Sequence, residues 1–153
     1  MVLIGGVSGL LLAGWYADKL TEKGVEGAHI KVAFTGVLIA IFPAIFAPIV
    51  DNYYLCLALC LFAVFGFAAA LALSPVALQI VIPNRMRGQV FALYLLIISL
   101  LGYAIGPLLV ALITDYVFKD ELLVGSSISL VATIYGPISA IAYFISRKKY
   151  MLL

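Results

Sequence analysis

Three side chains inside apolar stretches of this chain are potential nucleophiles or metal ligands: Ser8, Cys56 and Cys60. The two cysteines stand four residues apart, which places them on one face of a helix. A zinc site draws four ligands from Cys, His or carboxylate side chains, and the sequence near this pair contains no further Cys or His. We therefore expect two small buried thiols, with no metal and no other cofactor.

Ser8 lies in Gly6-Val7-Ser8-Gly9, which matches the G-x-S-G pattern of intramembrane serine proteases letter for letter. That chemistry requires a histidine on another helix to accept the proton of the serine. The one histidine, His29, falls in a polar loop, one short segment away. The sequence therefore favours a packing role for these small residues, and we expect no catalytic residue and no enzyme.

Ionisable side chains are absent from the apolar stretches, because every Asp, Glu, Lys and Arg falls between them or at their ends. Proton relays and ion-coupling sites usually place such groups within the bilayer. If an ion gradient drives this protein, the coupling group lies elsewhere. The polar groups left inside the stretches, besides several tyrosines, are Ser8, Thr35, Ser74, Gln79, Ser99, Ser127, Ser129 and Thr133.

The elements that carry these residues are long apolar segments. The chain is 66% hydrophobic and 10% charged, whereas soluble domains are about 25% charged. A helix needs roughly 20 apolar residues to cross a bilayer. The sequence predicts an all-α, polytopic membrane helix bundle in one domain, 1–153, with five transmembrane helices at about 1–17, 30–50, 53–82, 86–116 and 122–147.

The charges alternate between the breaks that separate these spans. Every Lys and Arg except Lys119 falls in the first break, in the third break or after the last span. Short loops rich in Lys and Arg stay in the cytoplasm. We therefore expect a bacterial inner-membrane protein whose segment begins outside and whose C-terminus is cytoplasmic. The basic residues do not form one continuous face, so nucleic acid is not an expected partner.

Two features of the spans concern helix packing. Gly5, Gly9 and Ala13 stand four apart and form a small-residue ridge that lets another helix backbone approach closely. Each complete span also contains proline, which membrane helices tolerate because neighbouring groups bond the freed carbonyls. These prolines are Pro43, Pro48, Pro75, Pro107 and Pro137.

The end of the first span carries a more specific pattern. A glycine is followed four residues later by an acid and a base, and a second base comes after them. Here the sequence resembles the major facilitator superfamily, whose signature loop reads G-x-x-x-D-[RK]-x-G-x-[RK]-[RK]. Thr21 stands where that family prefers glycine, and Glu22 where it prefers a base. The matching residues are Gly14, Asp18, Lys19 and Lys23.

Two further matches follow in the order of that family. Residues 83–88, Pro-Asn-Arg-Met-Arg-Gly, look like its P-x-x-x-R-G loop. Residues 102–107, Gly-Tyr-Ala-Ile-Gly-Pro, with Asp115 after them, look like its G-x-x-x-G-P…D pattern. The chain is thus similar to the eighth to twelfth helices of a twelve-helix carrier. Within the superfamily, residues 75–79, 83–88, 91–93 and 105–110 are most similar to Spinster-like carriers.

The resemblance implies secondary active transport of a small molecule by alternating access, with a lipid-like or organic-anion substrate. It implies a cavity lined by the third span with help from the first and fourth, and a cytoplasmic gating motif in which Asp18 acts as a latch. The cavity candidates are Ser74, Gln79, Tyr94, Ser99 and Tyr103. The gating residues are Gly14, Asp18, Lys19, Lys23, Arg87 and Gly88, and the helix-packing residues are Gly5, Gly9, Gly102, Gly106 and Pro107.

The resemblance also implies that one helix of this half and the whole N-terminal half of a carrier are missing, so we expect a C-terminal fragment. The expected partners are membrane lipids, the missing N-terminal half and the small-molecule substrate. Two other classes stay open. One is a small membrane scaffold or subunit that pairs with a separate N-terminal half and transports nothing alone. The other is an intramembrane enzyme, which loss of activity on mutating Ser8 would support.

The charge pattern predicts where the breaks lie relative to the membrane. Cysteines introduced at Glu26 and Arg85 should react with an impermeant maleimide from the cytoplasmic side, and one at Asp120 from the outside. Labelling of intact cells and of inverted vesicles measures this. Reaction of Arg85→Cys and Asp120→Cys from the same face would contradict five spans.

Overall fold

All described elements of this protein are helices. The computed structural model describes the backbone of residues 2–150 and their side chains, except those of 81, 121 and 147–150; residues 1 and 151–153 of the predicted domain lie outside it. The helices are α1 (Val2–Glu22), α2 (Ala28–Phe46), α3 (Tyr53–Val81), α4 (Arg87–Ile98), the π-helix η1 (Ser99–Ile105), α5 (Gly106–Leu112), the π-helix η2 (Ile113–Phe118), the short 3-10 helix η3 (Glu121–Leu123) and α6 (Val124–Tyr150). The predicted all-α bundle is confirmed.

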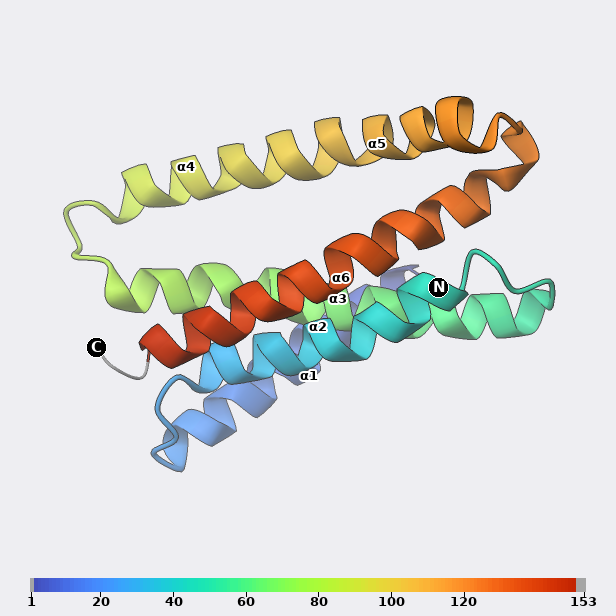
Figure 1. Ribbon diagram of the computed structural model, residues 1–153. Coiled ribbons are helices and arrows are strands. Elements are labelled where there is room, and N and C mark those ends of the chain that lie inside the picture. Colours follow the sequence, from blue (N-terminus) through green and yellow to red (C-terminus); the bar gives the residue numbers. More distant parts are fainter. Residues whose placement is uncertain (1, 151–153) are drawn as a thin grey trace.

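Four segments are long and apolar enough to cross a membrane: Ala28–Phe46, Tyr53–Ile80, Arg87–Phe118 and Val124–Ser146. Helix α1 is not among these four, although it lies alongside them in the bundle (Figure 1). It also extends to Glu22, beyond the apolar part predicted at 1–17. The last turn of α1 thus carries the charged residues that follow the first predicted span.

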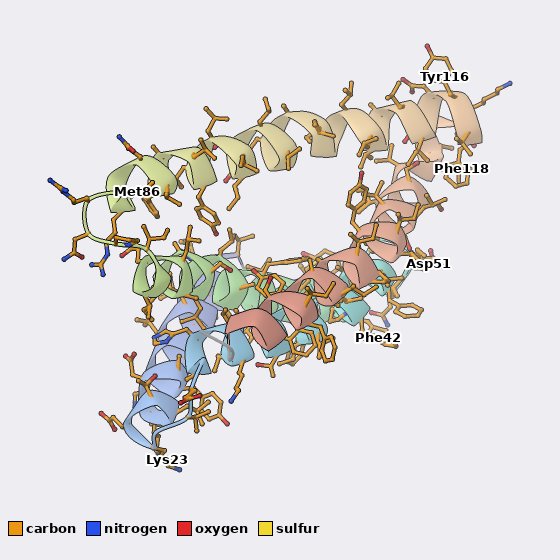
Figure 2. The ribbon with its side chains drawn as sticks, turned by 60° about the vertical axis from the view of Figure 1, so that its left-hand side comes forward. Lys23, Phe42, Asp51, Met86, Tyr116 and Phe118 are labelled. Atoms are coloured by element: carbon orange, nitrogen blue, oxygen red, sulfur yellow. The ribbon has the colours of Figure 1, made fainter. Side chains whose placement is uncertain are left out.

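The helices form a bundle with one rod standing apart. Helix α3 lies at the centre and packs on α1 and α2, and α6 packs on α2. Segments α4, η1, α5 and η2 run on as one rod over residues 87–118, which crosses the top of Figure 1 and is joined to the rest mainly at its two ends. Figure 2, turned by 60°, shows the same separation.

The breaks that contain most of the Lys and Arg residues lie at one end of the bundle, and the other breaks lie at the opposite end. Lys23 and Met86, in the basic first and third breaks, lie at one end in Figure 2; Asp51, Tyr116 and Phe118 lie at the other. The C-terminal end of α6 is on the basic side (Figure 1). The structure therefore brings the basic breaks to one face, as the alternation of charge predicts.

The interior is built from small residues, and the large apolar side chains point outwards. Nearly every buried hydrophobic residue is an alanine, whereas large ones such as Leu3, Phe42 and Leu96 are more than half exposed. A water-soluble protein shows the opposite distribution. Small residues at helix interfaces with large apolar ones outside are typical of packing in lipid, where close backbone approach replaces the hydrophobic driving force.

The predicted ridge on α1 faces α3. A Cβ added at Gly5 would lie 2.9 Å from the carbonyl oxygen of Leu61, and one at Gly9 would meet the carbonyl group of Phe65. One and two turns later, Ala13 and Ala17 join the buried cluster that also contains Ala69 and Leu73 of α3. The two helices therefore run parallel, with backbone against backbone along the ridge.

Helices α2 and α3 approach equally closely but run antiparallel. A Cβ at Gly36 would lie 2.9 Å from the carbonyl oxygen of Gly66, and a Cβ at Gly66 would lie 2.9 Å from the backbone nitrogen of Ala40. Nothing at this crossing can move aside without displacing a helix backbone. Gly66 is thus the residue of α3 whose missing side chain allows the backbone of α2 to approach closely.

Polar caps and proline explain several helix ends. The Asn52 side chain accepts hydrogen bonds from the backbone nitrogens of Tyr54 at 3.1 Å and Leu55 at 3.4 Å. Because N–H groups in the first turn have no partner within the helix, this cap allows α3 to begin at Tyr53. Helix α2 ends at Phe46, earlier than the predicted residue 50, because Ala47–Ile49 form turns around Pro48. Asp120 similarly bonds the backbone nitrogen of Leu122 at 2.9 Å.

The interior prolines have two different effects. Pro43, Pro75 and Pro137 lie inside α-helices that continue through them. Pro107 instead stands at the start of α5, directly after the π-helix η1. A proline ring clashes with the carbonyl four residues earlier, and the wider π-turn moves that carbonyl away. The rod is therefore irregular where its proline requires it.

Gly66→Ala tests the backbone contact on which the bundle depends. The new methyl group meets backbone atoms of Gly36 and Ala40 that cannot rotate away, so we expect destabilisation by about 1–3 kcal/mol, as for overpacked cores. The midpoint of thermal unfolding in detergent micelles measures it. Gly14→Ala is the matched control, because a Cβ there meets nothing within 4 Å; equal shifts for both variants would refute this packing.

Candidate functional site

A partly open apolar cavity of about 470 Å³ lies between the bundle and Val110 of the rod. Helices α2, α3, α5 and α6 each contribute to its walls. None of its lining residues is charged. They are Ile41, Ala44, Phe67, Val110, Ile128, Val131, Ala132, Tyr135, Gly136, Ile138, Ser139 and Ala142. The size is at the lower end of the range for small-molecule sites.

A cluster of three hydroxyl groups lies beside this cavity. The Oγ of Ser74, on α3, is 2.5 Å from the hydroxyl oxygen of Tyr143, on α6. Tyr143 directly follows the cavity residue Ala142. Tyr94, on α4, lies near Ser74. We call Ser74, Tyr94 and Tyr143 the hydroxyl cluster; Ser74 and Tyr143 are hydrogen-bonded, and Tyr94 is its member on the rod.

The hydrogen bonds of the cluster have a direction. The Oγ of Ser74 is also 2.6 Å from the backbone oxygen of Ala70, which can only accept. A serine has one hydroxyl hydrogen, so when it donates to Ala70 it accepts from Tyr143. The oxygen of Tyr143 then keeps its own lone pairs free to accept a hydrogen bond. A ligand with a hydroxyl or amide group could exchange for one of these bonds.

The opposite end of the rod is held by a buried hydroxyl pair. The Oγ1 of Thr114, on η2, lies 2.8 Å from the Oγ of Ser127, on α6, and Ser127 has no exposed surface. Each hydroxyl also reaches a carbonyl of its own helix, Val110 at 2.9 Å and Leu123 at 3.3 Å. A hydroxyl buried in apolar surroundings is costly when unbonded. This pair therefore fixes η2 against α6.

The structure brings together only part of the predicted cavity set. Ser74 and Tyr94 meet in the hydroxyl cluster, whereas Gln79, Ser99 and Tyr103 are exposed, Tyr103 at 81%. Tyr103 and Ser99 line a separate shallow depression on the rod itself, with Leu96, Leu100 and Ala104. The predicted third and fourth spans contribute α3 and α5 to the large cavity, but α1 does not line it.

Tyr143 is the residue that sequence reasoning did not single out. Its hydroxyl is the partner of Ser74, yet in the sequence it is one of several tyrosines in apolar stretches. The available signal was its position inside the last span, where a phenol needs a hydrogen-bond partner. The partner itself comes from 69 residues away, so spacing could not identify it.

The predicted gating motif lies at the basic end of α1. The Nε2 of His29 is 3.7 Å from Asp18 Oδ1, so the carboxylate faces the first turn of α2. His29 was expected in the loop; it instead belongs to α2, and its side chain is only 15% exposed. The Nζ of Lys19 lies 4.7 Å from the ring centroid of Trp15. Lys23 is exposed in the turn that follows α1.

The remaining predicted motif residues make few contacts. The Nε of Arg87 donates to the backbone oxygen of Ile82 at 3.2 Å, which closes the turn before α4. A Cβ added at Gly14, Gly88, Gly102 or Gly106 would meet nothing within 4 Å. Gly102 and Gly106 were predicted to pack helices, but they lie on the rod that stands off from the bundle.

No metal or nucleophile site emerges from the described residues. They contain no group of three or more His, Cys, Asp or Glu side chains that could hold a metal ion. Cys56 is half-buried and Cys60 is exposed, so the expectation of two buried thiols is wrong; this face of α3 points away from the bundle's interior. The hydroxyl of Ser8 bonds the carbonyls of its own helix, Ile4 at 2.5 Å and Gly5 at 3.2 Å.

The sequence of this chain is similar to part of a known transporter. The chain is 26% identical over 150 residues to an MFS-type efflux pump of Mycolicibacterium smegmatis, where MFS denotes the major facilitator superfamily. The match covers 95% of this chain and 34% of the pump, so the chain spans about a third of that relative. No family model matches the chain, and no solved structure matches it. The likeness supports a multi-pass membrane protein related to transporters.

Thr114→Val tests the pair that fixes the rod. The valine leaves the buried hydroxyl of Ser127 without its partner on η2, so we expect a loss of about 0.6–1.7 kcal/mol, the range for hydrogen bonds between membrane helices. The midpoint of thermal unfolding in micelles measures it. Thr21→Val is the control, because the exposed Thr21 bonds only its own helix, at Ala17 O. An unchanged midpoint for Thr114→Val would show that the pair does not hold η2.

Proposed function

We propose that these helices act in the transport of a small molecule across a cell membrane, as part of a secondary active carrier of the major facilitator type. The observation that carries the proposal is the similarity to the efflux pump, which extends over 95% of this chain. The apolar helices and the cavity between rod and bundle support it. The motif at Gly14, Asp18, Lys19 and Lys23 points the same way.

The cavity favours a lipid-like solute over an organic anion. Its lining is apolar and carries no positive side chain, which an anion would need for stabilisation in a low-dielectric site. The hydroxyl cluster beside it offers a few polar groups at fixed positions. An apolar lining with such groups can orient a ligand that carries no charge. A largely apolar molecule with one or two hydroxyl or amide groups fits this chemistry. The Spinster-like assignment stays a prediction on the sequence motifs.

The rod is suited to movement relative to the bundle. It contacts α3 and α6 near its ends, and two π-helical segments, η1 and η2, interrupt it. A π-segment has weaker backbone hydrogen bonds than an α-helix and often accompanies function. We propose that the rod rocks about η2 and opens or closes the cavity during alternating access. In a bacterial inner membrane, the basic end would face the cytoplasm.

Other helices complete the carrier in this proposal. The rod leaves many large apolar residues uncovered, including Leu93, Leu96 and Leu100, and the matched pump is about three times as long as the matched segment. An N-terminal half, on the same chain or a separate one, is the proposed partner. The second candidate is a membrane subunit that pairs with such a half and has no transport activity alone, because no Asp, Glu, His, Lys or Arg side chain lines the cavity.

Replacing the matching segment of the efflux pump by this chain tests the proposal. We expect the chimera to extrude a lipophilic fluorescent dye from cells, and Tyr143→Phe combined with Ser74→Ala to reduce the initial rate about threefold to tenfold, as loss of one or two hydrogen bonds implies. Tyr116→Phe is the matched control, because Tyr116 is 74% exposed at the opposite end of the rod.

Two outcomes would count against the proposal. One is a chimera that reaches the membrane at normal levels and resists heat normally, yet extrudes nothing. The other is equal efflux for the double variant and Tyr116→Phe, which would separate transport from the hydroxyl cluster. Saturable dye uptake by liposomes that contain the 153-residue chain alone would instead place a complete site within these five helices.

A further inference from the structure

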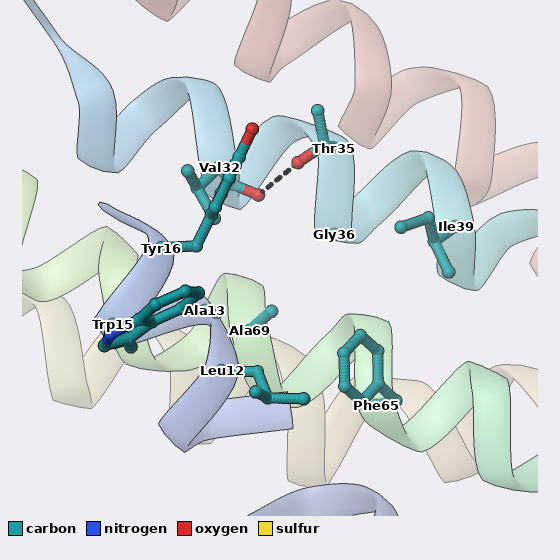
Figure 3. Close-up of a pocket in the computed structure, with 10 residues that line it drawn as sticks. All are labelled: Leu12, Ala13, Trp15, Tyr16, Val32, Thr35, Gly36, Ile39, Phe65 and Ala69. Atoms are coloured by element: carbon teal, nitrogen blue, oxygen red, sulfur yellow. Dashed lines mark hydrogen bonds between the residues drawn. The ribbon is translucent and has the colours of Figure 1, made fainter. Parts of the chain in front are cut away.

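A second cavity lies on the other side of α3, between α1 and α2. It measures about 300 Å³, and Figure 3 shows it with α3 as its floor. Ala13, Gly36 and Ala69 are among its lining residues, and they leave room because they are small. Leu12 and Ile39, at its rim, are about half exposed. The cavity is therefore an apolar slot that opens to the surroundings of the bundle.

One end of the slot lies near the turn between α1 and α2, and the other lies deeper along the helices. Ala17, Val32 and Ala33 pack together with Leu73 in the buried cluster near the turn between α1 and α2. From there the slot runs past Ala13 and Gly36 towards Ile39 and Phe65, deeper along the helices. Its long direction is thus that of the helices, which is also the direction of a lipid acyl chain in a bilayer.

The end near the turn carries the charge and the aromatic groups. Trp15 and Tyr16 line the slot there, 60% and 50% exposed. Trp and Tyr concentrate at the level of lipid headgroups. The Nζ of Lys19, one turn beyond Trp15, lies 4.7 Å from the centroid of its ring. The slot therefore has a cation at its interfacial mouth and an apolar interior.

The charges of this break balance in number, with Asp18, Glu22 and Glu26 against Lys19, Lys23 and Lys31, and Lys19 is the one that lies beside a lining residue of the slot, Trp15. The Oδ1 of Asp18 lies 3.7 Å from the Nε2 of His29, so this carboxylate faces the first turn of α2. Glu22 and Lys23 lie beyond Lys19, towards the exposed turn, and Lys31 is in the first turns of α2. Lys19 is the cation beside Trp15 and therefore the group that an anionic headgroup would meet.

We propose that this slot binds one acyl chain of an anionic phospholipid, whose headgroup lies against Lys19. A phospholipid satisfies both requirements at once, because its chain matches the apolar slot and its charge matches Lys19. A second helix would cover the apolar part, but it would also need an acidic side chain placed beside Trp15. The site lies on the opposite side of α3 from the proposed transport cavity, and its test does not depend on transport.

Trp15 makes the proposal measurable, because it is the one tryptophan in the sequence. The protein is reconstituted in bilayers of phosphatidylcholine with increasing fractions of phosphatidylglycerol, and either lipid carries brominated acyl chains that quench tryptophan fluorescence. Quenching then gives the relative binding constant of the two lipids beside Trp15. We expect phosphatidylglycerol to be preferred about fivefold, which is what one lysine near an anionic surface contributes.

Three variants separate the slot from general surface charge. Lys19→Gln should lower the preference to about one, and Thr35→Phe should do the same by filling the slot while Lys19 remains. Thr35 is an exposed residue of the slot (Figure 3), so the larger ring needs no repacking of the core. Arg85→Gln is the control at the same end of the bundle and should leave the preference unchanged. Ile39→Phe replaces Thr35→Phe if circular dichroism shows that the latter loses helix.

Several results would overturn the proposal. A preference that survives Lys19→Gln would remove the headgroup contact. A preference that survives filling of the slot would show attraction to the surface alone. A preference near one in the unaltered protein would show no selective site, and weak quenching by both lipids would indicate that protein, such as a second copy of the chain, covers the slot.

Discussion

Backbone contact between helices is the constraint on which this structure depends. At Gly9 and Gly66, α3 meets its neighbours so closely that a single methyl group would collide with main-chain atoms. In lipid, large side chains gain nothing by being buried together, so stability comes from van der Waals contact and from hydrogen bonds between helices. The small residues of α1, α2 and α3 provide the van der Waals contact between backbones. The large apolar residues lie on the outside of the bundle.

The same constraint explains why the rod differs from the rest. Residues 87–118 contain glycines, but a Cβ added at 88, 102 or 106 would meet nothing within 4 Å. Without close backbone approach, the rod is held through side chains: the Thr114–Ser127 pair bonds η2 to α6, and at the other end Tyr94 lies near Ser74. Hydroxyl contacts of this kind are individually weak and exchangeable. An element held in this way can leave a cavity beside it, whereas α1 and α2 cannot separate from α3.

Features that depend on local sequence could be predicted, and those that depend on packing could not. Helix limits such as Tyr53 follow from Asn52, a cap that acts within three residues. The charges that gather at one end follow from alternating spans. The contact of Ser74 with Tyr143 depends on α6 passing within reach of α3, which no spacing encodes. Tyr103 was assigned to the cavity because the family resemblance implies that the fourth span helps to line it. In the structure Tyr103 lies in the π-helix η1, and its side chain is 81% exposed.

The central claim is that a solute occupies the cavity between the rod and the bundle. Ser139→Cys places a thiol in that cavity, and Ile145→Cys, on the same helix, places one on the exposed surface. Both are made with Cys56 and Cys60 changed to alanine. The measurement is the rate of alkylation by a membrane-permeant maleimide as a lipophilic solute is added. We predict saturable protection of position 139 and none of position 145; equal rates at all solute concentrations would contradict the account.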